Sequence, residues 1–217
     1  MPKLNFIQML CVWALPLIFA ITVHEAAHGW VASKLGDKTA KMLGRVTLNP
    51  LKHIDMIGTV LVPAVLLFFG GFIFGWAKPV PVDWRNLKNI RRDAALVAIA
   101  GPCSNLLMAI FWAGIAKLGT IFVHQGLQAA VFLIYVGMAG ISINLMLGLL
   151  NLIPIPPLDG SRVVSALLSP RLAIQYENIQ RYGFMILLVL IFTGVLTFIL
   201  QPPYVLLQNL IYMVFSI

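Results

Sequence analysis

The chain has 217 residues, of which 60% are hydrophobic and only 10% are charged, and its mean hydropathy is +0.95. Soluble domains carry about a quarter charged residues, so this composition excludes an ordinary soluble protein and indicates an integral membrane protein. The net charge of +8 does not indicate nucleic-acid binding, because no polar domain could carry that surface and basic residues gather in the cytoplasmic loops of membrane proteins.

Five uncharged runs are long enough to cross a bilayer as a helix, which takes about 17 to 25 residues. They are residues 4–23, 56–77, 94–116, 127–150 and 182–200. A shorter apolar segment, 201–217, begins with Gln201, Pro202 and Pro203. Because no soluble domain remains between these runs, we expect one integral membrane domain over 1–217 and an all-α, multi-pass fold.

The first run leads directly into the sequence HEAAHGW, residues 24–30. We expect this run to stay attached as a membrane helix, because it is long for a signal peptide and has no small-residue cleavage site before His24. His24 and His28 are four residues apart, so on a helix they share one face and can bind one metal ion. Glu25 lies beside them, where it can take a proton from a metal-activated water, as in the H-E-x-x-H pattern of zinc proteases.

The cost of polar groups in lipid argues that this motif is functional. Short patterns of this kind also recur by chance, which is the alternative to a metal site. However, idle histidine and glutamate side chains are disfavoured at the end of a membrane helix, because they are expensive near lipid. Two histidines alone do not complete a catalytic zinc site, which takes three protein ligands and an open position.

The sequence NLIPIPPLDG, residues 151–160, supplies the strongest candidate for a third ligand. Its prolines cannot continue the preceding helix, and unwound backbone at membrane depth is tolerated only inside protein or around a wet cavity. Gly160 permits a tight turn after Asp159, so the segment is suited to break a span and direct Asp159 inward. The alternative is an ordinary helix end at which Asp159 caps the next helix. His53 and His124 are weaker candidates, and we expect both at the surface.

Three motifs occur in order along the chain: HEAAH at 24–28, GPCSN at 101–105 and NLIPIPPLDG at 151–160. Together they resemble the motifs of the site-2 protease family of intramembrane zinc metalloproteases, in the small form without a PDZ or CBS domain. Asn105 matches the asparagine of the family's G-P-x-x-N motif. The resemblance covers most of the chain, roughly residues 15 to 170.

The resemblance implies one Zn²⁺ per chain, with His24, His28 and Asp159 as its ligands. It also implies that Glu25 is the catalytic acid and base. Asn151 matches a family asparagine near the active site, where it would help to stabilise the oxyanion. The partner would be a membrane-anchored protein substrate in the lipid bilayer.

The distribution of basic residues bears on how the chain is threaded. Of the 15 Lys and Arg residues, ten lie between 33 and 93 and three follow residue 160. If 56–77 is re-entrant, these 13 share one side, whereas a full crossing would divide the ten equally, so the positive-inside rule favours the re-entrant form. It also brings Asp159 to the same face as His24. We therefore expect about four full transmembrane helices, the re-entrant segment, a short C-terminal apolar segment, and an active site near the cytoplasmic face of the cell membrane.

Two short stretches, LGRVTLNP at 43–50 and AKPVPVDW at 77–84, have Val and Pro in a pattern typical of strands. Plain loops are the alternative. We expect short membrane-associated β-strands, in part because the resemblance implies strands near the active site. Such an edge could pair with an extended substrate by strand addition.

The predicted function is hydrolysis of peptide bonds in or near transmembrane segments by a zinc metalloendopeptidase. A metal-ion or proton transporter would also place His, Glu and Asp in the membrane. Many transporters contain repeats with paired broken helices, whereas this chain shows one broken span. A catalytically inactive membrane scaffold is a third alternative, against which the presence of Glu25 argues.

Overall fold

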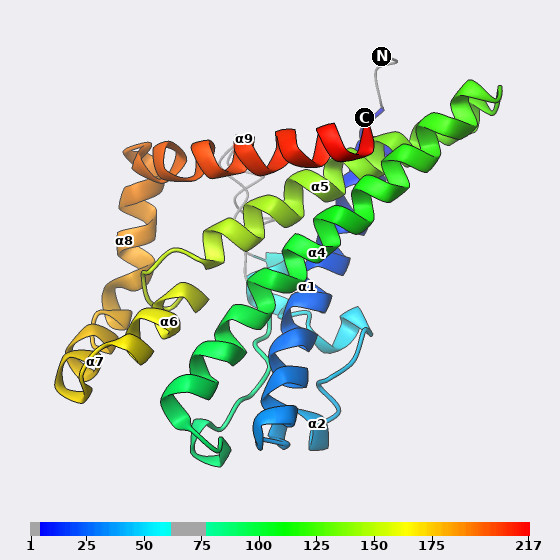
Figure 1. The fold of residues 1–217 in the computed structure, drawn as a ribbon. Helices are drawn as coiled ribbons and strands as arrows, with labels where there is room; N and C mark the ends of the chain where they lie inside the picture. The colour runs from blue at the N-terminus through cyan, green and yellow to red at the C-terminus, as the bar shows by residue number, and fades with distance from the viewer. Residues whose placement is uncertain (1–4, 62–76) are drawn as a thin grey trace.

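The computed structural model describes residues 5–61 and 77–217 and contains no strand within those ranges. Three long helices lie side by side, and a fourth crosses over them (Figure 1). The long helices are α1 (Phe6–Leu35), α4 (Ile90–His124), α5 (Val131–Asn151) and the crossing helix α9 (Val195–Phe215). The shorter ones are α2 (Thr39–Met42), α6 (Asp159–Leu167), α7 (Pro170–Glu177), α8 (Gln180–Phe192) and the single turns Pro50–Lys52, Met56–Leu61, Trp84–Asn86 and Gln128–Ala130.

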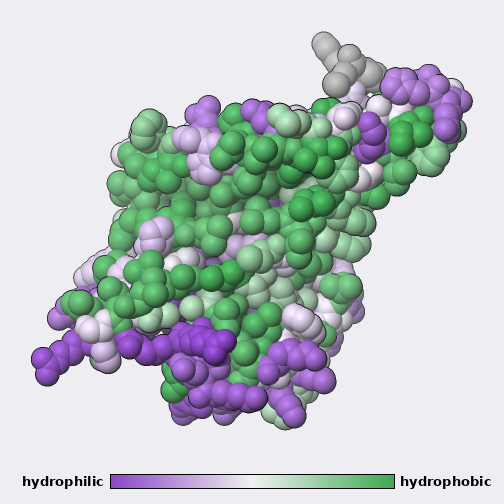
Figure 2. Space-filling model, viewed as in Figure 1, coloured by the Kyte–Doolittle hydropathy of each residue, from purple (hydrophilic) through white to green (hydrophobic). Residues whose placement is uncertain are grey.

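Among the described residues, four helices are long and apolar enough to cross a membrane, over Ile7–Leu35, Ile90–His124, Gln128–Asn151 and Val195–Phe215. A broad hydrophobic band covers the middle of the molecule and separates two hydrophilic ends (Figure 2). The larger of these, the basic end, lies at the end of the molecule that holds α2, α7 and the start of α4 (Figure 1). Exposed basic residues on or beside these elements include Lys34, Lys38, Arg85, Arg91 and Arg171. This arrangement is that of a multi-pass membrane protein. Most of the segment expected to be re-entrant, 56–77, lies outside the described residues.

The fourth span differs from the one expected over 182–200. That apolar run is interrupted at Gly194, which adopts a φ of 74°, a left-handed conformation that ends α8 and turns the chain into α9. The long helix begins only at Val195 and continues through Pro202 and Pro203. The prediction of a separate short segment over 201–217 is therefore wrong, because residues 201–215 continue α9.

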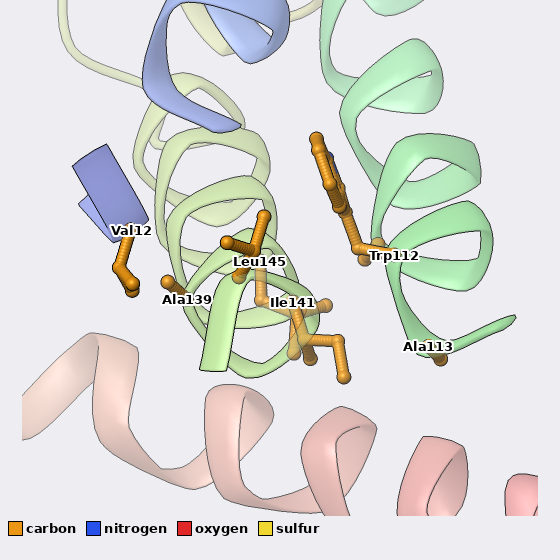
Figure 3. Close-up of a cluster of buried hydrophobic side chains, with 8 residues drawn as sticks. Val12, Trp112, Ala113, Ala139, Ile141 and Leu145 are labelled. Atoms are coloured by element: carbon orange, nitrogen blue, oxygen red, sulfur yellow. The ribbon is translucent and has the colours of Figure 1, made fainter. Parts of the chain in front are cut away.

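The core of the bundle is built where α1, α4 and α5 meet. Its buried side chains include Val12, Trp112, Ala113, Ala139, Ile141 and Leu145 (Figure 3). Gly137 and Gly140 let α5 approach α4 closely, because a Cβ atom at either position would overlap Ala116 or the Trp112 ring. Close packing through small residues holds membrane helices together, since lipid removes the hydrophobic driving force between them.

The chain leaves the helix after Asn151, as the prolines predicted. Residues 152–158 form turns and bends, and the Tyr176 hydroxyl of α7 donates a hydrogen bond to the Pro154 carbonyl at 2.7 Å. Gly160 was expected to form a tight turn, but it lies within α6, and a side chain there would overlap the carbonyl of Leu152. Protein covers this non-helical segment only in part, because Leu152, Pro154 and Pro157 are exposed.

The strands expected over 43–50 and 77–84 do not form among the described residues. The first stretch consists of turns and bends, and the second runs as an irregular chain into the single turn at Trp84. Pro79 and Pro81 have no N–H to donate, so this part of the chain cannot supply the regular hydrogen bonds of a sheet. Side chains hold much of its backbone instead.

Asp37, fully buried just after α1, is one of these side chains. Its carboxylate accepts hydrogen bonds from the Asp83 N–H at 2.9 Å, the Asn86 amide at 3.1 Å and the Thr39 N–H at 3.0 Å. Burial raises the pKa of Asp37, but these hydrogen bonds outweigh it and hold the pKa below its usual value of 3.8. Asp37 therefore ties residues 83–86 to the end of α1.

Candidate metal centre

His24 and His28 lie one above the other on the face of α1 that packs against α4, as their spacing predicted. Their Nε2 atoms are 3.0 Å apart. Asp159, from the first turn of α6, brings its Oδ2 atom to 3.2 Å from His24 Nε2 and 3.4 Å from His28 Nε2. The three side chains thus form a group of donor atoms that all lie within 4.8 Å of one another.

Asp159 does not act as the cap of α6. The N-cap position belongs to Leu158, and no side chain caps this helix. The Oδ2 atom of Asp159 is buried and has no hydrogen-bond donor within the described part of the chain. A buried carboxylate oxygen without a donor is costly, so its environment requires a positive partner.

The outer ring nitrogens of both histidines are fixed by carbonyl oxygens. His24 Nδ1 lies 2.5 Å from the side-chain oxygen of Asn105, and His28 Nδ1 lies 2.7 Å from the backbone oxygen of Val97. Because these oxygens can only accept, each Nδ1 carries the proton. Each Nε2 therefore presents a lone pair to the point where the two rings and Asp159 meet.

A chain of amides orients Asn105. Its Nδ2 group donates to the Asn144 side-chain oxygen at 3.1 Å, and Asn144 Nδ2 donates to the Gly140 carbonyl at 2.8 Å. Both asparagines are completely buried. The role of Asn144 was not predicted, although an isolated asparagine inside an apolar helix is itself a signal, since amides are costly in lipid.

The donor set fits a metal ion. Three electron-pair donors converge with no proton between them, an arrangement that is repulsive until a cation lies among them. Neutral imidazole and carboxylate are ordinary zinc ligands. Gly101 of α4 leaves the space clear, because a Cβ atom there would overlap the Nε2 atoms of His24 and His28.

Glu25 stands beside this group without joining it. One of its carboxylate oxygens, Oε2, accepts a hydrogen bond from the backbone N–H of Val80 at 2.7 Å. The side chain is half-buried and lies on the wall of a cavity.

The cavity has a volume of about 670 Å³ and a largely apolar lining drawn from α1, α5, α8 and α9. His24, Glu25 and Asn151 are among its polar lining residues. Asn151, at the last position of α5, donates one N–H to the Leu147 carbonyl at 3.0 Å. The cavity thus extends from the candidate metal ligand His24 into a space that accepts apolar side chains.

The remaining histidines lie away from this group. His124 is exposed at the end of α4, as expected. His53 is buried rather than on the surface, so that prediction is wrong: its Nε2 lies 3.0 Å from the carbonyl of Thr47, and folding of the 43–53 loop encloses the ring.

Comparison with known proteins supports the same class of site. The model of peptidase family M50 matches residues 114–194. Over 187 residues the chain is 42% identical to the Bacillus subtilis protein named "Putative zinc metalloprotease YwhC". This match covers 86% of this chain and 82% of the relative. The Mycolicibacterium smegmatis protein named "Putative zinc metalloprotease Rip2" is 29% identical over 192 residues, with 88% and 69% covered.

A more distant relative is the "Regulator of sigma-E protease RseP" of Escherichia coli. It is 33% identical over 115 residues, which are 50% of this chain but only 25% of that protein. No solved structure matches the chain significantly. The extent of the Bacillus subtilis match, together with the family model, shows that this chain belongs to peptidase family M50, the site-2 protease family, whose cofactor is Zn²⁺.

Proposed function

We propose that this protein is an intramembrane zinc metalloprotease that hydrolyses peptide bonds in or near the transmembrane segments of membrane-anchored proteins. His24, His28 and Asp159 hold one Zn²⁺ per chain. Glu25 is the general base and acid, and Asn151 helps to stabilise the oxyanion. Residues 1–217 form a single integral membrane protease domain.

One observation carries this proposal: three unprotonated donor atoms converge beside a glutamate that is not part of the group. A catalytic zinc site has three protein ligands and keeps a further position open for water or substrate. The half-buried Glu25 carboxylate on the cavity wall is suited to handle protons beside that position. A purely structural zinc site would be closed by a fourth protein ligand.

When bound, Zn²⁺ supplies Lewis-acid chemistry: it makes water nucleophilic near neutral pH and draws charge from a carbonyl oxygen. Glu25 accepts the proton of the attacking water and later donates it to the leaving amine. The protonated Nδ1 atoms of His24 and His28 stay hydrogen-bonded throughout, so both rings keep their orientation and their Nε2 lone pairs.

The lining of the cavity favours a transmembrane segment as the substrate. Its wall includes Ile21, Leu150, Leu187 and Leu200, which suit the apolar side chains of a transmembrane segment. A peptide bond exposed there needs new hydrogen-bond partners, because unpaired backbone groups are costly in an apolar medium. The amide of Asn151 has a second N–H beyond the one given to its own helix, and that N–H can be offered to the developing oxyanion.

The location of the site follows from charge. His24 and His28 lie in the half of α1 nearer the basic end. By the positive-inside rule that end faces the cytoplasm, so cleavage takes place near the cytoplasmic side of the cell membrane.

Cleavage of a defined substrate tests the function. The zinc-loaded chain in detergent is incubated with a single-helix membrane peptide that carries a helix-weakening Gly or Pro near its cytoplasmic third. Wild type should cut it, and Glu25→Gln should keep zinc and fold but cut more slowly by about 10²–10⁴-fold. Glu177→Gln, which changes a glutamate at the basic end, is the matched control and should cut at the wild-type rate.

Other outcomes separate the alternatives. If Glu25→Gln cuts as fast as wild type, Glu25 is not the base. If no variant cuts any membrane substrate, while vesicles carrying the protein move ions in a Glu25-dependent manner, the protein is a transporter.

A further inference from the structure

The catalytic glutamate of the proposed mechanism is held by a backbone group from a distant part of the chain. Glu25 Oε2 accepts the Val80 N–H at 2.7 Å, across 55 positions of sequence. A hydrogen bond to a carboxylate is charge-assisted, so it fixes the side chain more firmly than a neutral bond would. A glutamate otherwise has three flexible torsions, which would scatter its oxygens about the site.

The sequence around Val80 makes its N–H distinctive. In KPVPV, residues 78–82, prolines stand on both sides of Val80, so its N–H is the only backbone donor over 79–81. Lys78 and Val80 each precede a proline, which favours extended backbone. The segment is therefore pre-shaped, but it has no strand partner within the described residues to keep it in place.

Arg45 supplies that anchorage. Its Nη2 group lies 2.9 Å from the carbonyl oxygen of Lys78 and 3.4 Å from that of Pro79, the two carbonyls that immediately precede the Val80 N–H. A planar guanidinium can hold two oxygens in a fixed geometry, which an ammonium on a flexible stem does less well. A second contact holds the same segment, because the Lys78 N–H donates a hydrogen bond to the His53 carbonyl at 2.9 Å.

Packing brings the segment close to α1. Gly29 follows Glu25 by four residues, so it lies on the same face one turn along. A Cβ atom at Gly29 would come within 2.9 Å of both Val46 and Val80. The absence of a side chain there lets Val80 approach near enough for its N–H to reach Glu25.

We infer that Arg45 is a positioning residue for the catalytic base: it holds the backbone of residues 78–80 so that the Val80 N–H fixes the Glu25 carboxylate. The inference rests on the proposed function of Glu25 as general base. Within the described residues, no hydrogen bond or ion pair joins Arg45 to Glu25 or to the three metal ligands; its effect passes through two backbone carbonyls. Its loss should therefore lower kcat while KM and zinc content stay unchanged.

The test compares Arg45→Ala, Arg45→Lys and the control Arg171→Ala, which removes an exposed arginine of the basic end. Each full-length protein is assayed in detergent for zinc content, thermal midpoint, kcat and KM. We expect kcat of Arg45→Ala to fall by about 10–100-fold, since small misplacements of a catalytic group can cost that much, with Arg45→Lys intermediate. Millimolar guanidinium should restore much of the activity of Arg45→Ala and none of that of Glu25→Gln.

A backbone change provides a second, direct measurement. Incorporating the α-hydroxy analogue of valine at position 80 replaces only the N–H with oxygen and leaves Arg45 intact. Its kcat should fall as in Arg45→Ala, and adding Arg45→Ala to it should cost little more, because both changes act on one bond.

The outcomes are distinguishable from those for the function itself. If wild type cuts and Arg45→Ala matches Arg171→Ala in kcat, the inference is wrong while the protease assignment stands. The inference is also wrong if the kcat of Arg45→Ala falls only in proportion to lost zinc or lost folded protein, while the protein with the α-hydroxy analogue at position 80 keeps full activity. If wild type cuts nothing, the proposed function fails and this inference fails with it.

Discussion

Asn105 lies with its side-chain oxygen 2.5 Å from His24 Nδ1, although the two residues are 81 positions apart in the chain. A partner at the outer nitrogen sets which ring nitrogen of a metal-binding histidine carries the proton, and it raises the basicity of the other. Asn105 therefore orients His24 within the candidate metal centre.

Replacement of Asn105 should weaken zinc binding. Asn105→Leu keeps the size of the side chain but removes the oxygen, so His24 loses its fixed tautomer, and zinc affinity should fall by about 10–100-fold. Competition with a chromogenic chelator measures this. Asn144→Leu changes the amide that is hydrogen-bonded to Asn105, one step further from His24, and should have a smaller effect. Equal zinc affinity in wild type and Asn105→Leu would contradict the assigned role.

Zinc occupancy should depend on residues from two distant helices. The purified protein should contain about one zinc per chain, and His24→Ala, His28→Ala and Asp159→Ala should each lower that content strongly. His53→Ala is the matched control, because His53 is a buried histidine outside the group. Full zinc retention in Asp159→Ala, measured by elemental analysis, would remove Asp159 from the ligand set.

The space for the metal should depend on Gly101. Gly101→Ala places a methyl group against the Nε2 atoms of both histidines and should strongly reduce zinc content. Gly114→Ala, in the same helix, is the control, because its nearest neighbour would be Phe215 at 3.9 Å. Both changes favour the helix equally, so a difference in zinc content reports the local space. Equal zinc content in the two variants would contradict this account.

Labelling should reveal the threading of the chain. In a background with Cys11→Ala and Cys103→Ala, single cysteines at positions 38, 52, 85 and 171 should all react with an impermeant reagent from the cytoplasmic side. A cysteine at position 125, beyond the far end of α4, should react only from the other side. Opposite labelling at 52 and 85 would mean that residues 56–77 cross the membrane completely.

The buried carboxylate of Asp37 should stabilise the protein in a pH-dependent way. Its folded-state pKa is lowered, so its contribution is present above about pH 4 and is lost as the pH falls through the folded value. Asp37→Asn presents an N–H₂ group to backbone donors and should lower the thermal midpoint at pH 7. The gap between variant and wild type should narrow below about pH 4; a constant gap would show that the charge is not responsible.

Local spacing explains what could be predicted from the sequence. His24 and His28 are on one helical face whatever surrounds them, and the prolines of residues 151–160 stop a helix wherever they occur. Asp159 was singled out because it follows that break directly. These features depend on residues that are close together in the sequence, so they can be predicted without the fold.

The incorrect predictions concern features that depend on the surroundings. Gly194 was overlooked because the apolar run continues through it, whereas Pro202 and Pro203, read as a stop, lie inside α9. The valines near residue 80 indicated a strand, but the same stretch is held by side chains. Neither the hydrogen bond from Val80 to Glu25 nor the one from Asn105 to Asn144 can be found from spacing, because each joins segments that meet only in the folded chain.

The three candidate metal ligands come from α1 and α6, which are far apart in the sequence. They are therefore synthesised at different times. His24, Glu25 and His28 are made first, but the centre lacks Asp159 until α4 and α5 have been inserted and the chain has turned back through residues 152–158. On the proposed function, a growing chain would therefore have no complete zinc site while it is being inserted. Hydrolysis would begin only when α1, α4, α5 and α6 have come together.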